Sequence, residues 1–256
     1  MRYEEKVLAY IDILGFKNAV EKTIEINNGN KIENECEIQK IDNLLEEERL
    51  HLNIREYLLG KPKIKGKVTS QFSDTIIISY LEESDIHHIL LDVYILCAMA
   101  LEKGFLYRGA IVCGKIIHTE NKIFGPALID AYNIESTKAI FPRILLDDKI
   151  IDIVENNHSL YSNQDADNNI LNNIILYDFD GKPFINYIDK LDTGVDNGFE
   201  GKQKHLMYID EIIRNMDISD DSIKCKYLWL KEKYDCSFAI FKSAGVSDTM
   251  VVNEVQ

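Results

Sequence analysis

"YIDILGF" (residues 10–16) and "QFSDTIIISY" (residues 71–80) each place a single aspartate, Asp12 or Asp74, beside a long apolar run. Burying a carboxylate is costly unless it is paired or bound to a metal. We therefore expect the two acids to leave their strands at the same point and to hold cations between them.

The composition excludes some classes of function. The chain has 256 residues, of which 46% are hydrophobic, enough for one large domain with or without extensions. Its net charge of −14, from 43 acidic and 29 basic residues, argues against broad binding to nucleic acid or anionic lipid. An anionic small molecule stays possible, because bound Mg²⁺ inverts the local field.

Targeting and redox signals point to the cytoplasm. The first apolar run is short and contains Asp12, so it makes a poor signal peptide. No run reaches the roughly 18 apolar residues of a membrane helix, and we expect no membrane partner. The five cysteines are scattered without a CxxC pair, as is typical of reduced thiols.

Apolar periodicity gives the order of the elements. We predict a buried strand at residues 6–14, a helix at 17–26, one or two amphipathic helices at 32–59 and two strands around a turn at 64–80. The chain continues with a buried helix, a strand pair with its hairpin near "HTENK", a helix with proline in its first turn, and a strand with a short helix, at residues 84–104, 105–125, 126–139 and 141–157.

This order predicts the fold class. It fits an α+β domain with a mostly antiparallel sheet and helices on one face, for which the ferredoxin-like unit is the nearest template. We assign residues 1–156 to this core. Residues 157–256, with a late hairpin and two helices, are predicted to be an elaboration of the same domain.

The residues around Asp12 suggest a nucleotide. Mg²⁺ takes a few carboxylate oxygens and leaves its other positions to water and phosphate oxygens. Gly15 follows the first strand and a helix follows Gly15, an arrangement whose backbone amides bind phosphate. Alternatively, Asp12 caps the helix and the Asp74 side chain hydrogen-bonds the backbone of its own turn.

His118, near a hairpin turn, is expected to be exposed.

Four motifs then resemble a known family. "YIDILGF" and "QFSDTIIIS" are similar to the two metal-binding strands of class III nucleotide cyclases. "RGAIVCG" (108–114) and "FGPALIDAYNIES" (124–136) resemble the strand and helix that follow them. The motifs occur in the family's order over about residues 5–140, so the resemblance implies a class III cyclase domain.

The departures from this family are specific. The purine cyclases usually carry lysine where this chain has Ser70, and their helix pattern is replaced here by Pro126, Ile129 and Asn133. "DILGF", "FSDT", "RGAIVCG", "FGPALIDAYNIE" and "FPRI" instead resemble the Pycsar anti-phage cyclases. That resemblance implies a homodimeric pyrimidine cyclase that converts UTP or CTP to cUMP or cCMP. Two Mg²⁺ or Mn²⁺ ions per site and a separate effector protein are implied as well.

The resemblance also implies roles for individual residues. Asp12, Asp74 and the Ile13 carbonyl would hold the metal ions, and the amides of Leu14, Gly15 and Phe16 would bind the triphosphate. Arg108 and Arg143 are the candidate catalytic cations in the matching motifs, with Lys202 or Lys204 as further candidates, although Arg108 could equally pair with a carboxylate. The candidates for the base pocket are Tyr10, Ser70, Phe72 and Tyr132.

Two other functions fit the same residues. A degenerate cyclase fold could bind a nucleotide or a partner without turnover, since the usual transition-state Asn/Arg pair is absent. A palm-type nucleotidyltransferase also uses two strand carboxylates, but its product is an oligonucleotide. The mass of the product separates the three.

Overall fold

The computed structural model describes residues 2–27, 30–58, 66–82, 86–158, 173–190, 199–215 and 220–243. Its first half contains β1 (Glu4–Ile13), α1 (Phe16–Lys22), β2 (Ile24–Asn27), β3 (Asn30–Glu33), α2 (Glu35–Leu58), β4 (Val68–Phe72), β5 (Thr75–Leu81) and α3 (Ile86–Glu102). Its second half contains β6 (Tyr107–Thr119), β7 (Lys122–Phe124), α4 (Pro126–Thr137), β8 (Ile144–Leu146), α5 (Asp148–His158), β9 (Ile175–Tyr177), β10 (Pro183–Ile185), α7 (Phe199–Arg214) and α8 (Asp221–Ser243).

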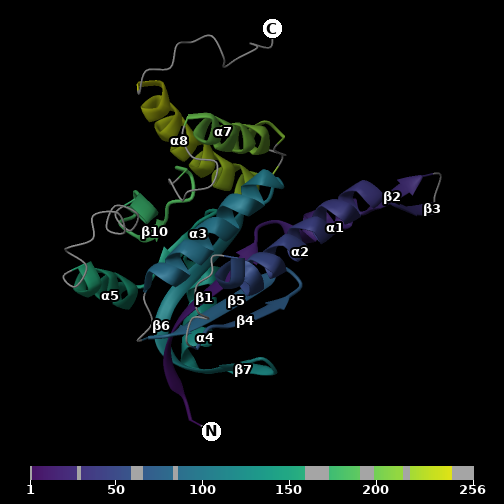
Figure 1. Ribbon diagram of the computed structural model, residues 1–256. Helices are drawn as coiled ribbons and strands as arrows, with labels where there is room; N and C mark the ends of the chain where they lie inside the picture. Colours follow the sequence, from purple (N-terminus) through teal and green to yellow (C-terminus); the bar gives the residue numbers. More distant parts are fainter. Residues whose placement is uncertain are drawn as a thin grey trace.

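One large sheet organises the chain (Figure 1). Its strands follow the order β4-β5-β1-β6-β8-β10-β9, with β7 paired to β6. Only β6 and β8 pair in parallel among the described strands. The portion β6-β1-β5-β4, connected through α2 and α3, has the strand order of a ferredoxin-like unit. The predicted α+β class with a mainly antiparallel sheet is confirmed.

Helices cover both faces of this sheet, whereas we predicted one. On the first face, Ala9 and Ile11 of β1 pack in one core with residues of α2 and α3. On the opposite face, Leu8 packs with Ala127 and Ala131 of α4. The prediction of a single covered face therefore holds for α2 and α3 but not for α4. The physical reason is that β1 is apolar on both sides, so both need cover.

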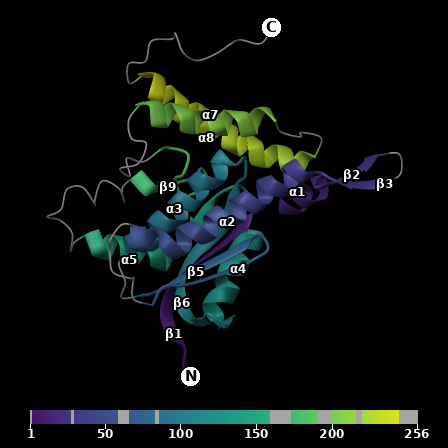
Figure 2. The same cartoon turned by 45° about the vertical axis from the view of Figure 1, so that its right-hand side comes forward.

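The C-terminal elements extend the same sheet and core. β10 pairs with β8 and with β9, which places the late hairpin in the main sheet. Helices α7 and α8 lie together beyond α3 (Figure 2), and Ile209 and Leu230 belong to the core beneath them. The division at residue 156 remains a prediction. Across the described ranges, no helix is both long and apolar enough to cross a membrane.

The region after α1 differs from the helix predicted at residues 17–26. Helix α1 ends at Lys22, and Ile24–Asn27 is instead strand β2, paired with β3 in a separate two-stranded sheet. β-branched Ile24 and Ile26 alternate with polar residues, a pattern that favours a strand. The Asn-Gly sequence that follows is a strong hairpin signal.

Gly109 lies where the backbones of β1 and β6 approach each other closely. A Cβ at this position would lie 2.2 Å from the Tyr10 carbonyl oxygen and 3.1 Å from the Ile11 Cα. We predict that Gly109→Ala lowers the free energy of unfolding by about 1–3 kcal/mol, because backbone cannot yield as a flexible side chain does. The measurement is chemical denaturation.

Gly114→Ala is the matched control on the same strand. There the nearest atom, the Ala127 Cβ, is 3.4 Å from the added Cβ, which is close to ordinary contact. Equal losses of stability in the two variants would contradict the argument from crowding.

Candidate active site

The three central strands carry a row of polar side chains across one face of the sheet. Asp12 of β1 lies opposite Thr75 of β5 and opposite Arg108 of β6. Phe72 of β4 extends the row beyond Thr75. Because residues paired in register point to the same face, all four side chains lie on the face that α4 covers.

Asp74 joins this row from the turn between β4 and β5. Its carbonyl oxygen accepts a hydrogen bond of 3.2 Å from the Ile13 amide, which fixes the turn against the end of β1. Ser73, beside it, has a φ of +54°, so the turn is tight. The structure thus brings Asp12 and Asp74 to one edge of the sheet, as the sequence predicted.

The carboxylate of Asp12 sits in a field with an excess of negative charge. Burial first, then the nearby Asp74 and Glu135, raise the pKa of Asp12 to about 6. Arg108 opposes this shift, with its Nη2 3.5 Å from the Asp12 Oδ2. The Thr75 hydroxyl donates a long hydrogen bond of 3.4 Å to the Asp12 Oδ1. The site therefore has more acids than its one arginine neutralises.

Glu135 is a site residue that the sequence analysis did not assign. It lies on α4 with only 3% of its surface exposed, and its Oε1 is 2.7 Å from the Arg108 Nε. Burial raises its pKa, and Arg108 opposes the rise. The sequence did contain a signal: Glu135 continues the four-residue spacing of the buried Ala127 and Ala131. An acid on the buried stripe of a helix needs a partner.

The donor chemistry of this site fits a hard divalent cation. Within the described ranges, no group of three or more His, Cys, Asp or Glu side chains is arranged to hold a metal by itself. Mg²⁺ is usually bound by one or two carboxylates, with substrate phosphates and waters as its other ligands. Asp12 and Asp74 supply such a pair, and burial followed by the charges of Asp74 and Glu135 raises the pKa of Asp12.

The predicted triphosphate ligands need one correction. The Leu14 amide donates a 2.8 Å hydrogen bond to the Leu106 carbonyl, so it is not available to a phosphate. Gly15 has a φ of +78°, and a Cβ there would meet no atom within 4 Å. Glycine is thus required by the backbone conformation, and the space beside it is open. Gly15 and Phe16 remain the candidates.

The four predicted base-pocket residues divide into two groups. The rings of Tyr10 and Tyr132 meet edge to face with centroids 6.0 Å apart, next to Asp12 and Glu135. Phe72 is 84% exposed at the end of the row. Ser70 instead has its hydroxyl 2.9 Å from the His118 Nε2, so it is occupied within the sheet.

Arg143, predicted as a catalytic cation, is held in a buried network of ion pairs and hydrogen bonds. It is 1% exposed, and its Nη2 donates to the Asp180 Oδ2 at 2.7 Å while its Nη1 pairs with Asp178. Asp178 also accepts a 2.6 Å hydrogen bond from the Trp229 indole. This buried network joins the start of β8 to the β9–β10 turn and to α8. The Arg143 guanidinium is therefore engaged by Asp178 and Asp180.

The lysines proposed as alternatives lie elsewhere. Lys202 and Lys204 are on α7, which packs against α3 on the face opposite Asp12. The Lys204 Nζ lies over the Tyr208 ring, 5.8 Å from its centroid. Arg108 is consequently the candidate cation that the structure places beside the two aspartates.

His118 is buried, whereas we expected it to be exposed. It is 3% exposed on β6, between the Ser70 hydroxyl and the Ser79 hydroxyl, which lies 2.8 Å from its Nδ1. The imidazole therefore bridges three strands. Burial, with a smaller contribution from Lys6, lowers its pKa to about 4.

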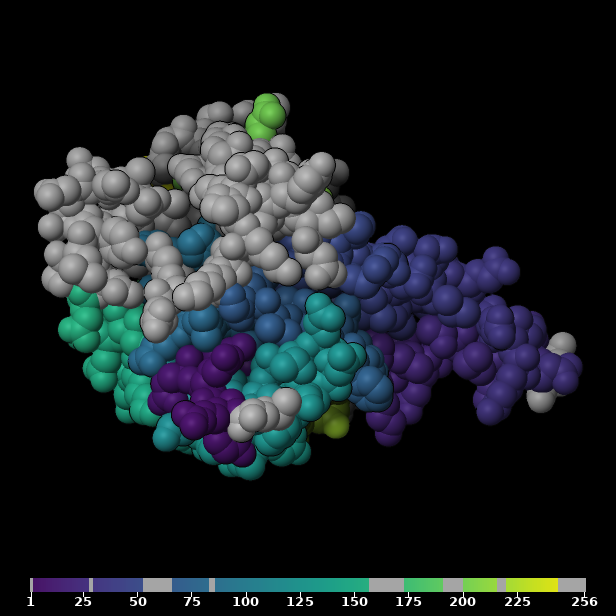
Figure 3. Space-filling model, turned by 60° about the horizontal axis from the view of Figure 1, so that its bottom comes forward, coloured from purple at the N-terminus to yellow at the C-terminus, as the bar shows by residue number. Residues whose placement is uncertain are grey.

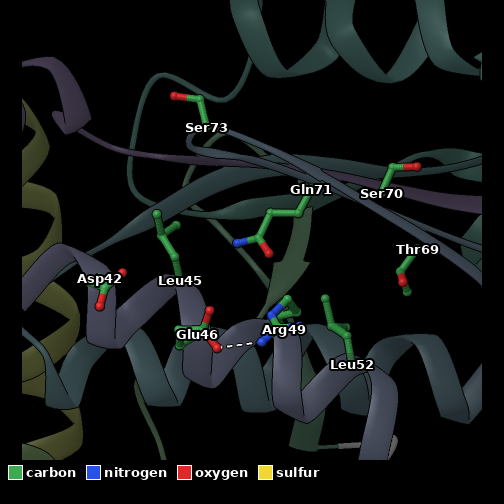
Figure 4. Close-up of a pocket in the computed structure, with 9 residues that line it drawn as sticks. All are labelled: Asp42, Leu45, Glu46, Arg49, Leu52, Thr69, Ser70, Gln71 and Ser73. Atoms are coloured by element: carbon green, nitrogen blue, oxygen red, sulfur yellow. Dashed lines mark hydrogen bonds and ion pairs between the residues drawn. The ribbon is translucent and has the colours of Figure 1, made fainter.

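A cavity of about 550 Å³ lies between α2 and the edge strand β4 (Figure 4). Gln71 in its wall donates a 2.8 Å hydrogen bond to Glu48, which is fully buried and whose pKa burial raises to about 8. Because the Gln71 side chain points toward α2, this cavity lies mainly on the face opposite Asp12. The carboxylate site and the cavity are therefore different places.

Comparisons with known proteins give structural likeness alone. No protein-family model matches the sequence, and no curated protein is found to be similar to it. The guanylyl cyclase Cya2 shares 13% identity over 60% of this chain and 80% of its own, with a TM-score of 0.41. A second similar structure is the monomeric guanylyl cyclase domain of the RhoGC fusion protein from the aquatic fungus Blastocladiella emersonii. It shares 12% identity over 72% of this chain and 95% of its own, with a TM-score of 0.42.

A third neighbour is a class III adenylyl cyclase-like ATP-binding protein from Pseudomonas aeruginosa. It shares 11% identity over 59% of this chain and 35% of its own, with a TM-score of 0.38. TM-scores at this level do not assign an activity, so the function has to be argued from the residues of the site.

The buried His118 predicts a pH dependence of stability. The unfolded chain takes up a proton near the ordinary histidine pKa of 6.5, whereas the folded protein does so only near pH 4. The free energy of unfolding should thus fall as the pH drops from about 6.5 to 4, by up to about 3 kcal/mol for this residue.

His118→Gln removes this titration and should flatten the decline. Urea denaturation of both proteins between pH 7 and pH 4.5 measures it. Because other groups titrate in both proteins, the difference between the two slopes is the quantity that matters. Superimposable slopes would show that the imidazole is not held neutral by the fold.

Proposed function

We propose that this chain is a nucleotide cyclase that converts UTP or CTP to the 3′,5′-cyclic monophosphate and pyrophosphate. The observation that supports this most directly is the convergence of Asp12 and Asp74. The Ile13 amide donates a hydrogen bond to the Asp74 carbonyl, and the charge of Asp74 adds to burial in raising the pKa of Asp12. Two carboxylates on neighbouring strands suit the metal-assisted transfer of a phosphoryl group.

Different residues of the site would hold the metal ions and supply a fixed positive charge. Bound Mg²⁺ or Mn²⁺ would supply the positive charge that neutralises the triphosphate and acidifies the ribose 3′-hydroxyl. Asp12 and Asp74, with the Ile13 carbonyl, would hold these ions. Arg108, kept in place by Glu135 at 2.7 Å, brings a fixed guanidinium to the same edge of the sheet.

The pyrimidine preference rests on the motifs and on the surroundings of two residues. Ser70, at the position of a lysine in the purine cyclases, is bonded to His118 and does not reach outward. Tyr10 and Tyr132 form an aromatic pair beside Asp12. We propose that this pair, with Phe72, packs against the smaller pyrimidine ring.

We also propose that a second copy of the chain covers the α4 face and completes the site. Phe72, Ile129 and Tyr132 expose 84%, 62% and 52% of their surfaces on this side of the molecule. Exposed apolar side chains that cluster beside a site indicate an interface. In the cytoplasm, the cyclic product would act on a separate effector protein during phage infection, as the motifs imply.

Asp12→Asn and Asp74→Asn test the metal assignment. Each should lower cyclase activity at least about 100-fold, as expected when an electrostatic contact to the transition state is lost. Asp152→Asn, an exposed acid on α5, is the control and should keep full activity. A second readout is the thermal stabilisation by Mn²⁺, which the wild-type protein should show and both variants should lose.

The substrate panel separates the three candidate functions. Purified protein is incubated with ATP, GTP, CTP or UTP and Mn²⁺, and the products are identified by mass. A cyclic pyrimidine mononucleotide supports the proposal. A linear or cyclic oligonucleotide would indicate a nucleotidyltransferase, and Mn²⁺-dependent binding without product would indicate a degenerate cyclase.

Ile129→Asp tests the covering of the α4 face. A charge in the interface should remove the contact between the two α4 faces, lower the mass of the assembly and abolish cyclase activity while the fold is retained. Met207→Asp is the matched control, since Met207 is also 62% exposed but lies on α7. Light scattering measures the mass of the assembly; the same mass for Ile129→Asp and Met207→Asp would contradict the proposed interface.

A further inference from the structure

Strands β2 and β3, residues 24–27 and 30–33, form an arm that projects from the body of the molecule. The arm extends beyond α1 and the start of α2 in both ribbon views, and the space-filling view shows it standing clear of the domain (Figures 1–3). All of its residues are exposed, including Ile24, Ile26 and Ile32 at 42%, 75% and 47%.

Two strands alone give such an arm little conformational stability. An isolated two-stranded ribbon is only marginally stable in water, and three or more strands are needed for independent stability. Both of its strands are edges, with backbone groups that can pair with another strand. The exposed isoleucines add apolar surface that the body of the domain does not cover. The arm is therefore built to be completed by another strand.

The alternation of hydrogen-bonded pairs between β2 and β3 shows which backbone groups of β3 point to its free edge. The Asn34 amide donates to the Thr23 carbonyl at 2.7 Å, so residues 23 and 34 form a hydrogen-bonded pair. Since such pairs alternate along antiparallel strands, Ile32 bonds inward to Glu25, its partner in register. The amides and carbonyls of Lys31 and Glu33 consequently face the free edge.

We propose that β3 pairs antiparallel with β3 of a second copy of this chain, about a two-fold axis at Ile32. Lys31 then lies opposite Glu33 of the second copy, and Glu33 lies opposite its Lys31. The outward backbone groups of these residues form both hydrogen-bonded pairs. Ile32 faces its own counterpart in the intervening non-hydrogen-bonded pair. The result is a four-stranded sheet with two ion pairs flanking an apolar contact.

Charge complementarity selects this occupant and this edge. The segment "KIE" is its own antiparallel complement, because a positive and a negative residue flank a central isoleucine symmetrically. Pairing through β2 about its charged residue would instead place Glu25 opposite Glu25, which is destabilising. A second copy thus satisfies β3 without any residue from another protein.

This contact is separate from the proposed α4 interface. The arm lies beyond α1, whereas α4 packs on the central strands β1 and β6 (Figure 2). A chain with two self-complementary surfaces assembles beyond the dimer. The arm contact can therefore be measured whether or not the proposed α4 dimer forms.

A symmetric disulfide tests the pairing directly. The exposed cysteines Cys36, Cys225 and Cys236 are first replaced by serine. Ile32→Cys should then form a covalent dimer under mild oxidation, because Cα atoms in a non-hydrogen-bonded pair are about 4.5 Å apart, within disulfide range. Ile26→Cys is the control on β2: it is more exposed, yet about 16 Å from its counterpart, across three strand spacings and two residues along the strand.

Charge exchange gives a second, reversible test. Lys31→Glu and Glu33→Lys each turn two attractive pairs into two repulsive ones, and each should raise the dissociation constant about tenfold. The double variant K31E/E33K restores both pairs and should regain wild-type association. Sedimentation velocity measures all four proteins, in the wild-type and the Ile129→Asp backgrounds.

The outcomes are distinct. Cross-linking of the Ile32→Cys variant but not of the Ile26→Cys variant, with recovery in the double charge variant, supports the arm contact. The proposal is overturned if Ile32→Cys does not cross-link faster than Ile26→Cys, or if the single charge variants associate as the wild type does. Neither result depends on cyclase activity, so failure of the proposed function leaves this test unaffected.

Discussion

The pairing of β1 between β5 and β6 is the constraint on which the rest of the structure depends. It runs the full length of the strand, from Lys6 to Asp12 on one side and from Glu4 to Ile13 on the other. This pairing alone places Asp12 beside Thr75 and Arg108. A slip by one residue would turn Asp12 into the apolar core, so register and site are set together.

The site combines charges that the surrounding protein does not balance. Asp12, Asp74 and Glu135 interact with one another, and Arg108 is the cation that bonds to two of them. Such an arrangement costs stability in the free protein and becomes favourable when positive charge arrives. Burial first, and then this imbalance of charge, raises the pKa of Asp12 to about 6.

Away from the site, buried polar groups join the layers of the fold. His118 bridges β4, β5 and β6 through Ser70 and Ser79. Arg143 ties β8 to the late hairpin and, through Asp178, to α8. Each group has hydrogen-bond or ion-pair partners far away in sequence, as is usual for buried polar groups. The residues that seemed available for chemistry by motif alone are thus divided between the proposed active site and the architecture of the fold.

Local sequence determined the elements and the position of the two aspartates. Apolar periodicity and turn residues identified β1, the β4–β5 hairpin, α3, the β6–β7 hairpin and α4, because these signals act within a few residues. The strand order, the covering of both faces and the role of Glu135 depend on contacts between distant segments. Whether Arg143 and His118 meet solvent or a buried partner was likewise decided by packing, since the same side chain suits either place.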